Sequence, residues 1–180
     1  MARASRQVST DRVPGDPRLR FLNAADHADA VADLLSCCAS RRWAAEVVAQ
    51  RPYADLAGVE EVSAAVLANL DWDEVLVALD AHPRIGERAR GHSREAGWSR
   101  AEQSGATTDD ERLRADLVRG NEIYEQRFDH VFLVCATGLS AEDVRTALRH
   151  RLGNDRATER VVVRAELTKI VELRLRRLAG

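Results

Sequence analysis

Apolar residues recur along most of the chain at the spacing of an amphipathic helix, and this periodicity limits the fold to helices packed around a shared core. The clearest case starts at Asp71, a good N-cap residue, after which apolar residues follow at i, i+3, i+4 and i+7: Trp72, Val75, Leu76 and Leu79. Aromatic residues make up only 4% of the chain and β-branched runs are short, which disfavours a sheet. A chain of 180 residues is most simply one domain, so we expect an all-α protein with a single compact multi-helix domain.

Caps and helix breakers set the expected boundaries. Predicted helices cover residues 23–36, 40–50, 58–68, 71–81, 99 onward, 108–128, 140–152 and 155–178, and the last of them is the longest. Ser140 and Asp143 form a clear capping box. Residues 88–98 are polar and contain glycine, which predicts a surface loop. Residues 1–20 are polar and rich in arginine, which predicts a disordered tail ahead of a helical domain of residues 21–180.

Charge and cysteine content exclude several classes of protein. The formal net charge is −2, from 27 basic and 29 acidic residues, so no global field would recruit nucleic acid or a membrane surface. Cys37, Cys38 and Cys135 show no zinc-ligand or Cys-x-x-Cys spacing, and free thiols are typical of a reducing compartment. No apolar run approaches the length of a membrane span, and the first 20 residues lack the apolar core of a secretory signal. We therefore expect a cytoplasmic protein.

One stretch holds residues that packing does not explain, namely His82-Pro83-Arg84-Ile85-Gly86-Glu87 and Ser99-Arg100-Ala101-Glu102-Gln103. Pro83 pushes the preceding residue out of the α region, so His82 should lie where the helix of residues 71–81 ends. A histidine there is explained structurally by its favourable interaction with the helix dipole. A rigidly placed histidine that titrates near neutrality is also suited to general acid–base catalysis, and the neighbouring Gly86 and Glu87 favour this second interpretation.

Ser99 and Glu102 also have two interpretations. Ser-x-x-Glu is a capping box, which would place both residues in the first turn of a helix for structural reasons alone. A helix start also offers free amides and a partial positive charge, which suit an anionic ligand, and Gln103 adds a donor and an acceptor. The histidines lack the paired spacing of zinc enzymes, so no metal site is expected. Cys135 lies in the apolar run 131–136 and should behave as a small hydrophobe.

Arg174 is out of place on the predicted C-terminal helix. Apolar residues define one face of that helix: Val163, Leu167, Ile170, Val171 and Leu178. Arg174 falls in the middle of this face, whereas Arg176 points the opposite way. An arginine on a core face needs an anionic partner, because an unpaired buried charge is too costly. The partner is either a carboxylate of the protein, Glu87 or Glu102, or the carboxylate of a substrate, and we expect Arg174 to bind the substrate.

Five motifs together carry a family resemblance. They are His82-Pro83-Arg84-Ile85-Gly86-Glu87, Ser99-x-x-Glu102-Gln103, Asn121-x-x-Tyr124-x-x-Arg127-Phe128, Phe132-Leu133-Val134-Cys135-Ala136 and the closing segment from Ile170 to Leu175. In this order and spacing they resemble the 2-oxo-4-hydroxy-4-carboxy-5-ureidoimidazoline (OHCU) decarboxylases, which act last in the breakdown of urate to allantoin. The resemblance covers residues 21–178 and departs at Asp129, where many relatives carry glycine.

The resemblance implies an all-helical, cofactor-free enzyme, usually a homodimer, that converts OHCU to (S)-allantoin and CO2. His82 would be the catalytic acid/base and Glu102 its carboxylate partner. Substrate contacts would come from Pro83, Ser99, Arg100, Ala101, Gln103, Val134, Cys135, Ala136, Thr137 and Gly138. In this substrate the departing carboxylate sits next to a ring C=N bond that can take up the electrons left behind, so pyridoxal or thiamine is not needed.

Two other functions are compatible with the residues. The same His82 and Glu102 pair could serve a hydrolase or cyclase that acts on a related ureido compound. A non-enzymatic helical module could instead bind nucleic acid through the arginine-rich C-terminal helix, although the net charge and the absence of a helix-turn-helix pattern argue against it. Release of CO2 separates the first alternative from a decarboxylase.

Overall fold

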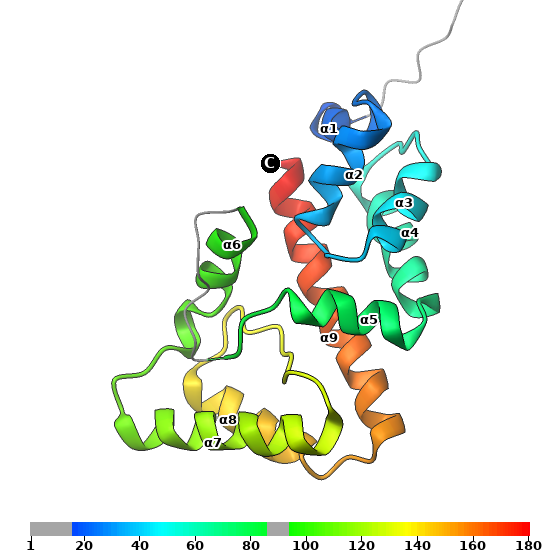
Figure 1. Ribbon diagram of the computed structural model, residues 1–180. Helices are drawn as coiled ribbons and strands as arrows, with labels where there is room; N and C mark the ends of the chain where they lie inside the picture. Colours follow the sequence, from blue (N-terminus) through cyan, green and yellow to red (C-terminus); the bar gives the residue numbers. More distant parts are fainter. Residues whose placement is uncertain (1–15, 86–93) are drawn as a thin grey trace, which may run out of the picture.

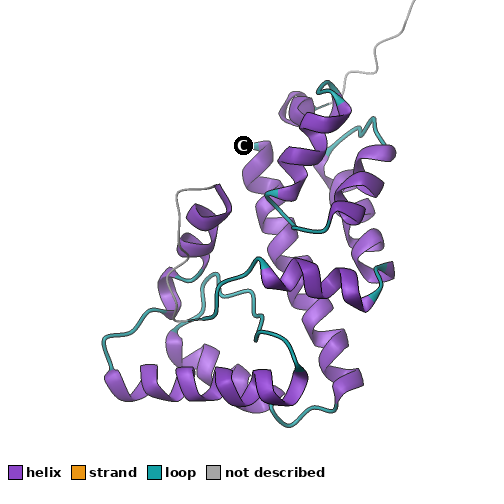
Figure 2. Cartoon of the chain, viewed as in Figure 1, coloured by secondary structure: helices purple, strands orange, loops and turns teal. Residues whose placement is uncertain are grey.

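The computed structural model describes residues 16–85 and 94–180, which fold into helices joined by short loops (Figure 1). The elements are η1 (Pro17–Leu19), α1 (Arg20–Asn23), α2 (His27–Leu35), α3 (Arg41–Ala49), α4 (Leu56–Asn69), α5 (Trp72–Asp80), α6 (Arg94–Glu102), η2 (Ser104–Ala106), α7 (Glu111–Phe128), α8 (Ala141–Arg151) and α9 (Arg156–Ala179). Within these described ranges there is no strand (Figure 2). The all-α class and the long C-terminal helix, which has 24 residues, are confirmed.

Two hydrophobic clusters make up the core. The larger cluster joins α2 to α5 with the apolar face of α9, on which Val163, Leu167 and Val171 are buried. The smaller cluster lies between α7 and α8, around Tyr124 and Leu148. Figure 1 shows α9 passing behind α5 and continuing to the N-terminal helices, so this helix connects the two ends of the molecule.

The segment of residues 131–136 lies between the two clusters and packs against both. Val131, Leu133 and Cys135 face the larger cluster, whereas Phe132, Val134 and Ala136 face the smaller one. Side chains that alternate between two sides with a period of two residues are typical of an extended chain. The sequence predicted a short buried apolar run here, and its extended conformation is a result of the structure.

Three predicted helix starts coincide with a side-chain cap, at Ser40, Ser140 and Asp155. The Ser40 hydroxyl accepts a hydrogen bond from the Trp43 amide at the start of α3. Ser140 and Asp143 form the predicted capping box of α8. Helix α5 ends at Asp80 with Ala81 as its C-cap, and His82 follows as predicted. Helix α7 begins at residue 111, slightly later than expected, because the Asp110 carboxylate accepts bonds from two first-turn amides.

The predicted N-terminal boundary at residue 21 is corrected by the structure. The described chain already begins at Asp16, whose carboxylate caps η1, and Leu19 is fully buried in the larger cluster. Asn23 was expected to start a helix, but it ends α1. Its side-chain amide instead exchanges two hydrogen bonds with the backbone of Tyr53, at 2.8 and 2.9 Å. The rest of the predicted tail, residues 1–15, lies outside the described residues.

The prediction for α6 was wrong. The helix was expected to start at Ser99 after a loop, but it spans Arg94–Glu102, so Ser99 and Glu102 lie near its C-terminal end and form no capping box. Trp98 packs against the larger cluster, and this tertiary contact supports a helix whose polar composition gave no apolar periodicity. Residues 88–93 of the predicted loop, together with Gly86 and Glu87, lie outside the described residues.

None of the helices in the described ranges is both long and apolar enough to cross a membrane.

Candidate active site

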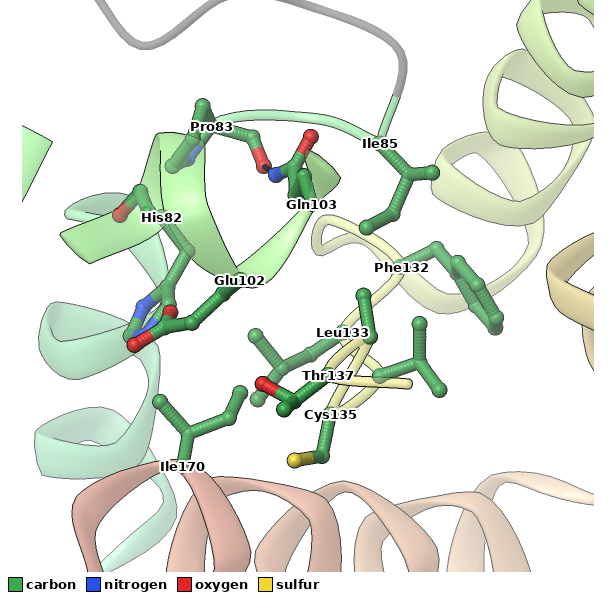
Figure 3. A pocket seen from close by; sticks show the side chains of 13 residues that line it. His82, Pro83, Ile85, Glu102, Gln103, Phe132, Leu133, Cys135, Thr137 and Ile170 are labelled. Atoms are coloured by element: carbon green, nitrogen blue, oxygen red, sulfur yellow. Dashed lines mark hydrogen bonds between the residues drawn. The ribbon is translucent and has the colours of Figure 1, made fainter. Parts of the chain in front are cut away.

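A pocket opens where the C-terminal ends of α5 and α6 meet the 131–136 segment and α9 (Figure 3). Its cavity volume is about 20 Å³, so the side chains leave only a small space between them. Its lining residues are His82, Pro83, Ile85, Ser99, Glu102, Gln103, Phe132, Leu133, Val134, Cys135, Ala136, Thr137 and Ile170. Residues from four parts of the sequence therefore meet around one cavity.

His82 presents one ring nitrogen to its own helix and leaves the other unpaired. Its Nδ1 lies 2.9 Å from the carbonyl oxygen of Ala78, one turn earlier, whereas Nε2 is buried without a hydrogen-bond partner among the described residues. Because a carbonyl oxygen only accepts, Nδ1 carries the proton and Nε2 holds a lone pair. Burial, together with the smaller effect of the nearby charge of Arg174, lowers the pKa of His82 from 6.5 to about 4. The imidazole is therefore neutral at neutral pH.

Glu102 is the last residue of α6, and two arginines of α9 fix its carboxylate. Arg174 donates from Nε to Oε1 at 3.0 Å and from Nη2 to Oε2 at 2.8 Å. Arg177 adds a bond from Nη1 to Oε1 at 2.9 Å. The Glu102 and Arg174 side chains are only 8% and 5% exposed, so this is a buried ion pair. Arg174 also donates to the Ser99 hydroxyl at 3.1 Å, which adds a second link between α9 and α6.

In this structure Arg174 pairs with a carboxylate of the protein. Its partner is Glu102, so its guanidinium is engaged by a protein carboxylate. The predicted face of α9 was right, since Arg174 is 4% exposed and the side chain of Arg176 is 54% exposed. Arg177 was missed in the sequence, although it lies three residues after Arg174 and such pairs share a helix face.

The charge of Glu102 acts on His82 across the pocket. It raises the pKa of the imidazole, against the larger lowering effects of burial and of Arg174. The cavity thus contains a neutral base with a free lone pair and, near it, a carboxylate whose orientation is set by two guanidinium groups. Such a pair can accept a proton from a bound molecule and return it at another atom.

The segment after His82 is held in place by side chains from α7 and from the loop after α6. Gln103 donates from Nε2 to the Pro83 carbonyl at 3.3 Å, and Asn121 of α7 donates to the Ile85 carbonyl at 3.1 Å. Arg84 forms an ion pair with Glu125 of α7, with an Nε–Oε1 distance of 2.6 Å. Asn121 belongs to a motif that sequence inspection singled out, and its role here is to support the pocket wall.

Most of the predicted site residues come together at the pocket. Nine of them line it: His82, Pro83, Ser99, Glu102, Gln103, Val134, Cys135, Ala136 and Thr137. The predicted contacts Arg100 and Ala101 are exposed residues of α6 outside the lining, and Gly138 lies beyond the lining in a turn with φ of +82°. Cys135 is half-buried, and burial raises the pKa of its thiol, which fits the predicted role of a small hydrophobe.

Four lining residues were not predicted: Ile85, Phe132, Leu133 and Ile170. All four are apolar, and Ile85, Phe132 and Leu133 fall inside motifs quoted for the resemblance. Their sequence signal is the same as that of any core residue, so only their position at the cavity distinguishes them. Within the described ranges, no group of three His, Cys, Asp or Glu side chains is placed to hold a metal ion.

Comparison with known proteins places these motifs in one family. A family model described as OHCU decarboxylase matches residues 23–176. The 2-oxo-4-hydroxy-4-carboxy-5-ureidoimidazoline decarboxylase of Amia calva is 31% identical over 134 residues, which are 73% of this chain and 77% of that protein. The uric acid degradation bifunctional protein TTL of Arabidopsis thaliana is 29% identical over 146 residues, which are 79% of this chain and 45% of that protein. The chain thus spans less than half of the bifunctional plant relative.

Solved structures share the fold. An OHCU decarboxylase crystallised in the presence of (S)-allantoin superposes with a TM-score of 0.71 at 24% identity, over 86% of this chain and 98% of that one. A structure of (S)-allantoin synthase gives a TM-score of 0.66 at 17% identity, over 89% of this chain and 53% of that one. The helical arrangement around the pocket is therefore that of known proteins.

Proposed function

The chain belongs to the OHCU decarboxylase family and is thus a carboxy-lyase of urate degradation, and we propose that the pocket around His82 and Glu102 is where it converts OHCU to (S)-allantoin and CO2. The observation that carries this proposal is the buried, unpaired Nε2 of a neutral His82 that opens into a cavity beside the fixed carboxylate of Glu102. A buried nitrogen without a partner is costly in a resting protein, and a bound substrate would satisfy it.

The substrate supplies its own electron sink. Its name places a hydroxyl and the departing carboxylate on ring carbon 4 and the ureido group on carbon 5. When CO2 leaves, the electron pair of the broken bond flows into the neighbouring ring C=N bond, and the ring nitrogen takes a proton from solvent. The product of this step is an enol, which needs one proton moved from oxygen to carbon 5.

His82 is suited to that proton transfer. Its neutral Nε2 accepts the proton of the 4-hydroxyl as the C–O bond becomes a carbonyl, and the resulting imidazolium donates the proton to carbon 5. The carboxylate of Glu102 stabilises the transient imidazolium charge. Because His82 lies on one side of the cavity, carbon 5 receives its proton from one face, which gives a single enantiomer. Since each step uses the substrate's own bonds and these side chains, we propose a cofactor-free reaction.

The rest of the lining holds the substrate. Ser99 and Gln103 supply polar side-chain groups, and we propose that the backbone N–H groups of the lining residues Val134 and Ala136 also bind the substrate. Arg174 is bonded to Glu102, so its role is to hold the carboxylate beside His82 rather than to bind the substrate carboxylate. The apolar side chains Ile85, Phe132 and Ile170 exclude water from the carboxylate, whose charge disappears as CO2 leaves.

The cellular setting is part of the same proposal. We infer a homodimer that acts on a small molecule in the cytoplasm and binds neither nucleic acid nor membrane. Against a nucleic-acid-binding module, the arginine at the centre of the terminal helix face is buried against Glu102 and unable to reach a phosphate backbone.

The experiment adds the purified protein to freshly generated OHCU and follows its decay, the release of CO2 and the optical activity of the product beside an enzyme-free control. We expect faster decay with stoichiometric CO2 and a product enriched in the (S) form. Decay at the control rate would refute the activity. Faster decay without CO2 would favour the hydrolase or cyclase alternative.

A further inference from the structure

The 131–136 segment forms one wall of the pocket, and its backbone is anchored from behind. The Cys135 amide donates to Oε2 of Glu166 on α9 at 2.7 Å. The Leu133 carbonyl accepts a bond from Nη1 of Arg151 at the end of α8. In an extended chain, the backbone groups of residues two apart point to the same edge, so both anchors hold one edge of the segment.

The opposite edge belongs to the residue between them. By the same alternation, the N–H and C=O groups of Val134 point away from Glu166 and Arg151, and Val134 lines the pocket. Leu133 and Cys135 line the pocket as well, so a displacement of the anchored edge would move three neighbouring residues of the lining. The side chains of the wall pack against both clusters, but no helix or sheet bonds its backbone, so the backbone position at the pocket depends on these side-chain anchors.

The two anchors are built differently. Arg151 is 5% exposed and is itself fixed by the fully buried Glu159, which accepts from its Nε at 2.7 Å. The Tyr124 hydroxyl also donates to Glu159, so this anchor is part of the core. Glu166 has a side chain that is 13% exposed, and its second oxygen pairs with the exposed Lys169 at 2.6 Å. Glu166 is thus a charged acceptor at the rim of the core, and replacing it removes little packing.

We propose that Glu166 is a positioning residue for the decarboxylation, acting through the Cys135 amide to fix the wall against which the substrate is held. The inference rests on the proposed function. Glu166 lines no part of the pocket and touches no reacting atom, so it acts only by placing the wall. A bond from an amide to an ionised carboxylate is about twice as strong as one between neutral groups, which suits an anchor that must be rigid.

Loosening the wall has two consequences. The substrate loses its fixed orientation, and small misplacements of reacting groups have large effects on rate. The substrate also samples positions in which carbon 5 presents its other face to His82, so the product becomes more racemic. A side chain that only stabilised the fold would change neither the rate constant of the folded enzyme nor the enantiomeric excess.

The test compares Glu166→Ala with Glu166→Gln, which keeps an oxygen acceptor for the Cys135 amide. Lys169→Ala removes the surface ion pair but leaves the anchor, and Glu172→Ala removes an ion-paired carboxylate of α9 that does not touch the wall. We expect Glu166→Ala to lower kcat/KM by roughly 10- to 100-fold and to reduce the enantiomeric excess, with enzyme in excess so that the uncatalysed reaction is negligible. Glu166→Gln should recover most of both, and the two controls should behave as wild type.

Amide hydrogen exchange at Cys135, followed by NMR, gives a readout that is independent of activity. Exchange should be slow in wild type and Glu166→Gln and faster in Glu166→Ala. An active wild type with unchanged kcat/KM, enantiomeric excess and Cys135 exchange in Glu166→Ala would overturn the proposal. If wild type itself fails to convert OHCU, the proposed function fails, and the exchange rates still decide whether Glu166 anchors the wall.

Discussion

Glu102 and Arg174, which are 72 residues apart in the sequence, form a buried two-pronged ion pair with N–O distances of 3.0 and 2.8 Å. This pair attaches the end of α6 to α9 and orients the carboxylate that faces His82. It also occupies the arginine that sequence inspection considered for substrate binding. The pair therefore both stabilises the fold and orients a carboxylate of the site.

Replacing Glu102 by glutamine should reduce stability as well as activity. The substitution leaves Arg174 buried beside a neutral amide, and breaking a buried pair costs roughly 3–5 kcal/mol. It also removes the charge that stabilises an imidazolium at His82. The free energy of unfolding, measured with denaturant, and kcat/KM should therefore both fall. A variant with wild-type stability and lost activity would show that the ion pair is not part of the folded framework.

Arg174 and Arg176 should differ sharply when each is replaced by alanine. Arg174→Ala strands Glu102 in the core and should cost roughly 3–5 kcal/mol of unfolding free energy. Arg176→Ala removes an exposed pair with Glu60 and should change it by no more than about 0.5 kcal/mol. Equilibrium unfolding of the two variants under one buffer condition makes the comparison, and equal tolerance would contradict the burial of Arg174.

His82→Asn should leave a folded protein that has lost most of its activity. The imidazole follows the last turn of α5 and has one hydrogen bond, to Ala78, so its removal disturbs little packing. Loss of a positioned general acid/base lowers turnover by about 10²- to 10⁴-fold. A thermal melt followed by circular dichroism gives the Tm and shows that the variant is folded. Single-turnover kinetics give the rate. Near-normal turnover in the folded variant would remove His82 from the mechanism.

Stability should fall as the pH is lowered from 6.5 towards 4. The pKa of His82 is lowered from 6.5 to about 4 in the folded protein, so in this window the unfolded chain binds a proton that the folded state does not. The loss attributable to this group is roughly 3 kcal/mol. His82→Gln should show a correspondingly weaker pH dependence. Burial also lowers the pKa of His130. Its effect on the pH dependence of stability is the same in wild type and in His82→Gln, so it cancels in the comparison.

The same pKa predicts the acid limb of activity. Since the neutral imidazole is the base, kcat/KM should stay independent of His82 protonation down to about pH 5 and fall near pH 4. A limb centred at 6.5, the ordinary value for histidine, would mean that the imidazole is exposed in the working enzyme.

Activity should survive treatment with EDTA. The carboxylate nearest to His82 in the pocket, Glu102, is already bonded to Arg174 and Arg177, which leaves a poor donor set for a cation. Turnover before and after chelation, with elemental analysis of the purified protein, tests this expectation. Loss of turnover on chelation with recovery on adding back one metal would contradict it.

The sequence by itself determined the helices and the nature of the site. Apolar spacing and caps are short-range signals, so they gave the class, the end of α5 at His82 and the buried face of α9 that contains Arg174. The five motifs also indicated the family. Where these local rules failed, at Asn23 and at Ser99, a tertiary contact had replaced the predicted cap: Asn23 bonds Tyr53, and Ser99 accepts from Arg174.

Only the tertiary structure decided which residues meet. Propensity and periodicity act over a few residues, whereas the pairing of Glu102 with Arg174 and of Cys135 with Glu166 depends on how helices pack across the chain. The lowered pKa of His82 has the same origin, because burial is set by neighbours from α6 and α9 that no local pattern identifies. The sequence therefore specified the candidate site residues, and packing fixed their protonation, partners and orientation.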